Sequence, residues 1–281
     1  MGYKEYLPCA ELKDYVECFW SQAPDYHHLV LQQSIDKILP DGCIDILFRK
    51  SKRVQGPNSA YSYIVGTMTA AIDVPRGQSE VVAVRFRPGG ALPFLKISAY
   101  CLTDTSVNLT DLFGDRTNSL TDEIFNESAM HRRIKVLERF LLRLKSSNGF
   151  LESSFSRTLF SIESTKEVSR IDQLCEYWGK SVRQMERSFL SQVGITPKMY
   201  LKVKRFQYLA LNLSKVNGKL DWASLAASHG YYDQSHLIRD CKVLTGLTPE
   251  KYKLFLEMSH LSNTVPPASN IVHQKGERYE F

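Results

Sequence analysis

Two short stretches of this chain carry arginine, glutamine and serine side chains that can hydrogen-bond the edges of nucleic-acid bases. Arg183 and Arg187 lie in the first stretch, and Gln234 and Arg239 lie in the second. Arginine can donate two hydrogen bonds to guanine, and glutamine can exchange two with adenine, each pairing being worth about 1–3 kcal/mol of discrimination. Residues of these types on an exposed helix would suit direct reading of a duplex.

The first stretch must be positioned by a helix that begins at Ser181. Ser181 and Gln184 form the pattern of a capping box, and Gly194 is a typical left-handed stop. Apolar residues at helical spacing predict one buried face: Val182, Met185, Phe189 and Val193. The opposite face then presents Arg183, Glu186 and Arg187. A shorter apolar stripe before it ends at Gly179, which predicts two helices joined by a tight turn.

The second stretch repeats this pattern at an offset of 52 residues. Asp221 and Asp233 are N-caps for two more short helices, separated by Gly230. The second of these buries Leu237, Cys241 and Leu244, so its outward residues are Gln234, Ser235, Ile238, Arg239 and Lys242. Residues 197–213 predict one longer helix that holds the two units at a fixed separation.

These motifs resemble the DNA-binding domain of the AraC/XylS transcription regulators. The resemblance rests on four groups of residues in order: Ser181, Met185, Arg187 and Phe189; Gly194, Thr196, Pro197 and Tyr200; Gly230 to His236; and Gly246, Thr248, Pro249 and Tyr252. It implies recognition helices at 182–193 and 234–245, which would enter successive major grooves about 34 Å apart. It also implies double-stranded DNA and RNA polymerase as partners. Tyr232 departs from the family's small polar residue and bears on base preference at the second helix.

The charge distribution also favours a polyanion as partner. The net charge is +6, and residues 165–260 carry 15 Lys/Arg against 9 Asp/Glu, whereas the rest of the chain is balanced. A basic module beside a neutral one indicates binding at one end of the molecule. Besides the base-reading positions, five lysines are expected on phosphates: Lys180, Lys198, Lys202, Lys215 and Lys242.

The first 105 residues are typical of a β-rich domain. Short runs of β-branched and aromatic residues at 15–20, 37–48, 61–68 and 80–86 are separated by turn residues. Alternation of Val82, Val84 and Phe86 with polar or small residues predicts a half-buried strand. We therefore expect an α+β two-domain chain, with an N-terminal cupin-like barrel or sandwich flanked by helices and an all-α C-terminal domain. Motifs around Pro40 and Pro88 resemble the N-terminal domain of a poorly characterised subgroup of these regulators, which implies a sensory or dimerising role.

The boundaries follow from the composition. We expect a sensor or effector domain at 1–128, a helical dimerisation or linker region at 129–167, the DNA-binding domain at 168–260 and a flexible tail at 261–281. The helix at 130–145 has an apolar face that would either form a dimer or pack on the β domain. Residues 163–167 are the expected hinge. No apolar run approaches the ~20 residues that span a bilayer, and we expect a cytoplasmic protein.

The sequence gives only weak indications of effector binding, metal binding or catalysis. Arg85 and Arg87 could clamp an anionic effector, but pairing with Asp41 or Asp45 is the favoured interpretation. His27 and His28 lack a third metal ligand in register, and no cofactor or metal is expected. The alternatives are an alkyl acceptor of the DNA-repair type at Cys43, another enzyme in the N-terminal domain, or a protein-interaction module that has lost DNA binding. The N-terminal domain has no recognisable catalytic constellation, so we expect no enzyme.

Overall fold

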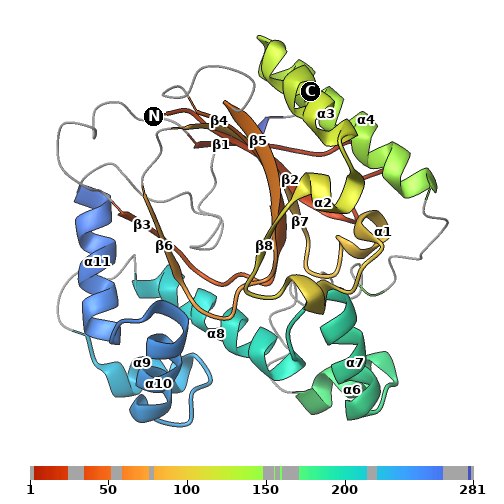
Figure 1. Cartoon of the computed structure of the whole chain (residues 1–281). Helices are drawn as coiled ribbons and strands as arrows, with labels where there is room; N and C mark the ends of the chain where they lie inside the picture. Colours follow the sequence, from red (N-terminus) through yellow and green to blue (C-terminus); the bar gives the residue numbers. More distant parts are fainter. Residues whose placement is uncertain are drawn as a thin grey trace.

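A computed structural model describes residues 3–24, 35–51, 59–75, 79–147, 155, 159, 171–213, 220–261 and 278–279. The chain forms a sheet domain, with helices on one side, and a set of helices beneath it (Figure 1). The two histidines expected in a polar loop, the hinge at 163–167 and most of the tail at 261–281 lie outside the described residues.

The sheet domain contains a curved sheet of seven strands in the order β8-β5-β4-β7-β2-β1-β9 (Figure 1). Its strands are β1 (Tyr3–Tyr6), β2 (Val16–Gln22), β4 (Ile44–Ser51), β5 (Ala60–Val65), β7 (Ser79–Phe86), β8 (Ser106–Asn108) and β9 (Arg278–Tyr279). Neighbours pair antiparallel except β1 and β9, which are parallel. Strands β3 (Ile35–Ile38) and β6 (Ile72–Pro75) form a separate antiparallel ribbon. The β-rich first domain is thus confirmed as antiparallel.

Strand β7 lies between β2 and β4 and is buried on both faces. Val82, Val84 and Phe86 enter the main core, whereas Val81 and Ala83 pack on the other face with Cys18 and Trp20. The prediction of a half-buried strand was therefore wrong. A second apolar cluster covers the face that alternation alone assigns to solvent.

Helices cover one face of the sheet. They are α1 (Leu92–Leu95), the 3-10 helix η2 (Ala99–Leu102), α2 (Leu109–Phe113), α3 (Arg116–Asn126) and α4 (Met130–Ser147). In α4 the apolar residues Ile134, Leu137 and Leu141 are at most 2% exposed and belong to the core of the sheet domain. The apolar face of this helix is thus used within the chain, as the core-packing interpretation expects.

The C-terminal helices form two units joined by a long helix. The first unit is α6 (Ile171–Trp178) and α7 (Val182–Gln192), the connector is α8 (Pro197–Leu213), and the second unit is α9 (Trp222–Ser228) and α10 (Gln234–Thr245), followed by α11 (Pro249–Leu261). Figure 1 shows the units at opposite ends of α8, beneath the sheet domain. None of the described helices is long and apolar enough to cross a membrane.

Candidate nucleic-acid interface

Helix α7 is fixed at both ends by local interactions. Ser181 accepts a hydrogen bond from the Gln184 amide, and the Gln184 side chain accepts one from the Ser181 amide, so the predicted capping box is confirmed. Gly194 follows the helix with φ +93°, a conformation that favours glycine. This local geometry is what the sequence predicts.

The face of α7 away from solvent is an aromatic core. Met185 and Phe189 are fully buried, and Phe155 stacks on Trp178 with ring centroids 5.1 Å apart and meets Phe189 edge-on at 5.3 Å. The opposite face is exposed at all three predicted positions: Arg183, Glu186 and Arg187. Those side chains are therefore free of the core and accessible to a partner.

One residue of the predicted apolar face of α7 is not buried. Val182 is 51% exposed, although it is in register with Met185 and Phe189. It is the first residue of the helix, and side chains in a helix lean toward the N-terminus. Its side chain consequently extends past the end of the core.

Helix α10 repeats the arrangement in the second unit. Asp233 accepts a hydrogen bond of 2.6 Å from the His236 amide, and Gly246 ends the helix at φ +74°. The predicted core residues are buried: Leu237, Cys241 and Leu244. Of the predicted outward residues, Gln234, Ser235, Arg239 and Lys242 are exposed and Ile238 is half-buried.

The long helix α8 connects the two cores. Tyr200, near its N-terminal end, belongs to the core of the first unit, whereas Phe206, Leu209 and Leu213 belong to the core of the second. A single continuous helix that enters both cores limits the motion of one unit relative to the other. The predicted fixed separation therefore has a physical basis.

An ion cluster links α8 to α10. Asp240 is 4% exposed, and its carboxylate lies 3.0 Å from Lys202 Nζ, 3.9 Å from an Arg205 nitrogen and 3.4 Å from His236 Nε2. Lys202, expected on a phosphate, thus neutralises a buried carboxylate. Lys198 is exposed in the same helix, and Lys180 donates to Ser188 Oγ at 3.3 Å, while Lys215 lies outside the described residues.

An exposed tyrosine stands beside the second set of candidates. Tyr232 directly precedes the N-cap Asp233 and is 93% exposed. It occupies the position that Lys180 has in the first unit, 52 residues earlier. A large aromatic ring with almost no packing in the chain has no role in the core, so we add it to the candidate surface.

The candidate residues of the sheet domain form an internal cluster. Arg85 Nε and Nη2 donate to Asp45 at 3.1 and 2.8 Å, and Arg85 Nη2 lies 3.5 Å from Asp41. Arg87 instead donates to the Lys13 carbonyl at 2.9 Å. The effector clamp formed by both arginines is therefore wrong, and pairing of Arg85 with Asp41 and Asp45 is confirmed.

The alternative at Cys43 finds no support in its surroundings. Its thiol is buried, and burial raises its pKa well above the ordinary value, with Asp41 and Glu17 adding to the rise. A reactive cysteine needs a lowered pKa and access to solvent. Cys43 has neither.

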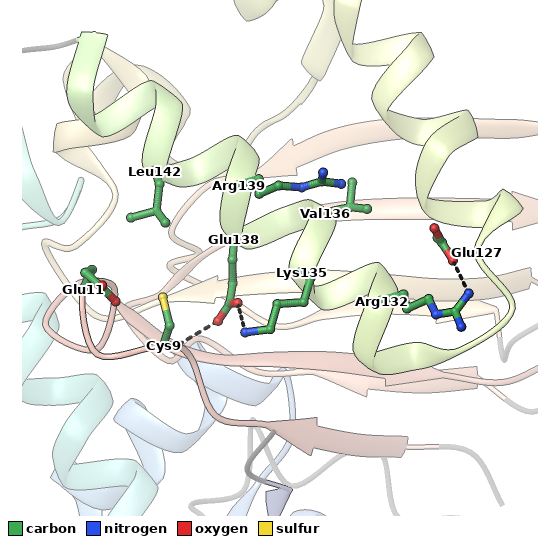
Figure 2. A pocket seen from close by; sticks show the side chains of 9 residues that line it. All are labelled: Cys9, Glu11, Glu127, Arg132, Lys135, Val136, Glu138, Arg139 and Leu142. Atoms are coloured by element: carbon green, nitrogen blue, oxygen red, sulfur yellow. Dashed lines mark hydrogen bonds and ion pairs between the residues drawn. The ribbon is translucent and has the colours of Figure 1, made fainter.

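A groove lies between α4 and the segment that carries Cys9 and Glu11 (Figure 2). It encloses about 520 Å³, and its cations Arg132, Lys135 and Arg139 each face a carboxylate: Glu127 at 3.7 Å, Glu138 at 2.9 Å and Glu123 at 2.7 Å. Its charges are thus already balanced. It is formed by the sheet domain, apart from the recognition helices.

Comparison with known proteins gives two family matches. Residues 174–254 match a helix-turn-helix domain, and residues 4–108 match a domain of unknown function (DUF6597). No curated protein matches the chain by sequence.

Among solved structures, the chain is similar to three forms of ToxT from Vibrio cholerae. ToxT of strain O395 is 10% identical with a TM-score of 0.37, over 80% of this chain and 97% of ToxT. Its complex with (E)-4-(8-methylnaphthalen-1-yl)but-3-enoic acid is 10% identical with a TM-score of 0.37, over 91% of this chain and 100% of ToxT. Wild-type ToxT of strain SCE256 with an unsaturated fatty acid bound is 11% identical with a TM-score of 0.36, over 90% of this chain and 94% of ToxT. TM-scores this low add nothing to the family matches.

The doubled helix-turn-helix, its exposed polar faces and the family match over 174–254 define a DNA-binding transcription regulator. The antiparallel sheet domain precedes these helices, and its residues 4–108 are the ones that match the domain of unknown function. The helix-turn-helix match and the doubled arrangement support an AraC-type regulator, as the sequence motifs predict.

Proposed function

We propose that this regulator reads DNA sequence through the exposed faces of α7 and α10. The residues in contact with bases would be Arg183, Glu186 and Arg187 from α7, and Gln234, Ser235, Ile238 and Arg239 from α10, with Lys242 on a neighbouring phosphate. The two helices would occupy successive major grooves, about 34 Å apart along one side of the duplex.

One observation carries this proposal. In both helices the candidate residues are concentrated in the N-terminal half and project from the face opposite the buried core. The C-terminal ends of the same helices contact the sheet domain, through Val193 and Leu244. The half that is left accessible is the half through which a helix-turn-helix contacts base edges.

Arg187→Ala provides the test. Operators would be selected from random DNA with the whole protein, and affinities then measured for the selected operator, its single-base variants and unrelated DNA. We expect Arg187→Ala to lower operator affinity by about 1–3 kcal/mol and to relax preference at one position. Affinity for unrelated DNA should change little.

A matched control is Arg143→Ala, which removes an exposed arginine from α4 in the sheet domain. It should leave base preference unchanged. An equal loss of affinity for all DNA in Arg187→Ala would show that Arg187 contacts a phosphate, and the base-reading role would then be wrong.

We further propose that the sheet domain, extended to the end of α4, serves as a sensory or dimerising domain without catalytic function. The packing of α4 against α1 and α3 supports this boundary. A homodimer, a small-molecule effector, contact with RNA polymerase and a cytoplasmic location are parts of the same proposal. Sedimentation of the whole protein, alone and with operator DNA, tests the dimer.

A further inference from the structure

The segment 66–71 of the sheet domain contacts both recognition helices. It connects β5 to β6, and Thr67 Oγ1 donates a 2.5 Å hydrogen bond to the carbonyl of Val193, at the C-terminal end of α7. Four residues later, the Ala71 amide donates a 3.0 Å hydrogen bond to the carbonyl of Leu244, at the C-terminal end of α10. One short segment of the first domain therefore joins two helices that are 52 residues apart in sequence.

The length of this segment limits the separation of the two helix ends. Four residues of fully extended chain span at most about 14 Å. Movement of the C-terminal end of α7 away from that of α10, beyond this span plus the reach of the Thr67 side chain and the two hydrogen bonds, must break one of those bonds. The segment is consequently a second connection between the units, in addition to α8.

A second hydroxyl strengthens the contact with α7. Thr103 Oγ1 donates a 2.6 Å hydrogen bond to the carbonyl of Gly194. A Cβ added at Gly194 would lie 2.9 Å from the Ala99 carbonyl oxygen, so the turn after α7 is packed closely on η2. The last carbonyls of a helix have no hydrogen-bond donors within the helix. At the end of α7, the hydroxyls of Thr67 and Thr103 donate to two such carbonyls.

Apolar contacts accompany these hydrogen bonds at the second unit. Leu39 is 3% exposed and belongs to the same core cluster as Phe206 and Leu237, and Ala71 packs against that cluster. At the first unit, a Cβ added at Gly42 would lie 2.9 Å from the ring of Tyr200. The sheet domain is thus packed against both units and the connecting helix.

We propose that Thr67, Thr103 and the Ala71 amide are positioning residues for DNA recognition. They act through α7 and α10 by fixing the distance between the recognition helices, and so determine which spacing of half-sites the protein prefers. This inference rests on the proposed function of α7 and α10. It assigns to the first domain a direct part in the choice of operator.

The test compares spacing preference in the whole protein. Affinities would be measured for the selected operator and for operators with one base pair added or removed between the half-sites. Thr67→Val and Thr103→Val remove the hydroxyls with little change of shape. In the double variant, the ratio of affinities between the best and the altered spacings should fall at least about fivefold, which is the low end of the effect expected for two lost hydrogen bonds.

Two variants separate positioning from general destabilisation. Thr67→Ser keeps the donor and should keep the spacing preference. Thr105→Val removes a hydroxyl that bonds Leu102 O within the sheet domain, so it should not change the preference. Thermal melts check folding, and Thr103→Val, at a half-buried site, provides the same test alone with a smaller change if the double variant does not fold.

Each outcome decides between the two proposals. If the wild type selects no operator, the proposed function fails, and the positioning role that rests on it fails with it. If the wild type prefers one spacing and the threonine variants keep that preference, or lose affinity equally at all spacings, the positioning role is overturned while the proposed function stands.

Discussion

At the residue scale, two carboxylates share one guanidinium inside the sheet domain. Arg85 makes a two-point contact with Asp45 and lies 3.5 Å from Asp41. Burial raises the pKa of Asp41, an effect that Arg85 opposes and the neighbouring Asp45 charge reinforces. Asp41 therefore holds a proton more readily in the folded chain than in the unfolded chain.

This gives a pH prediction for Asp41→Asn. A carboxyl whose folded pKa is raised favours folding at low pH, and that contribution is lost as the pH rises from the unfolded pKa, about 3.9, through the folded one. Wild type should thus lose stability relative to Asp41→Asn as the pH rises above about 4. Urea unfolding of both proteins across this range measures the difference. A difference that is constant with pH would contradict the raised pKa.

Tyr232 gives a second prediction at this scale. Its ring is 93% exposed, so Tyr232→Ser should change the free energy of unfolding by no more than about 0.5 kcal/mol. If the ring contacts DNA next to α10, operator affinity should fall about fivefold, with the loss confined to bases of that half-site. Tyr100→Ser, which removes a 62% exposed tyrosine from η2, is the control and should leave binding unchanged. Unchanged operator affinity in Tyr232→Ser would exclude Tyr232 from the interface.

At the element scale, each recognition helix depends on a local cap. Ser181→Ala removes the acceptor for the Gln184 amide and should cost about 1 kcal/mol of unfolding free energy. Ser181→Asp retains an acceptor and should stay close to wild type. Urea denaturation followed by tryptophan fluorescence is a suitable measurement, because Trp178 packs against the core of the same unit. Equal losses in both variants would mean that the hydroxyl does not cap the helix.

The elements that could be predicted from the sequence are those formed by interactions between near neighbours in the chain. The caps at Ser181, Asp221 and Asp233 and the extent of α8 follow from interactions within a few residues, and all were predicted. The bounds of β1, β6 and β8 were not, because these strands are three or four residues long and depend on pairing with distant partners. Short segments carry too little periodicity to be recognised.

The errors and omissions have one physical origin. Double-sided burial of β7 depends on a second apolar cluster, and the pairing of Lys202 with Asp240 depends on how α8 crosses α10. The contacts of segment 66–71 with α7 and α10 join residues more than 120 positions apart. Local pattern defines which face of an element is apolar, but it contains no information on which distant element covers that face.

At the scale of the whole molecule, the excess positive charge belongs to one module. Residues 165–260 carry 15 basic and 9 acidic side chains, and the rest of the chain is neutral. Binding to DNA should therefore weaken steeply with salt, because each neutralised phosphate releases counterions. Only cations that are free to reach phosphates contribute to this dependence.

Two lysines of α8, four residues apart, separate these roles. Lys198 is exposed, so Lys198→Ala should lower the slope of log affinity against log salt by about 0.9 and leave stability unchanged. Lys202 neutralises buried Asp240, which retains Arg205 and His236 nearby, so Lys202→Ala should instead cost about 1–2 kcal/mol of unfolding free energy. Its salt slope should match wild type. Titrations of operator DNA at four salt concentrations, with urea unfolding of each protein, decide the matter: a reduced slope in Lys202→Ala would mean that this lysine leaves Asp240 to contact a phosphate.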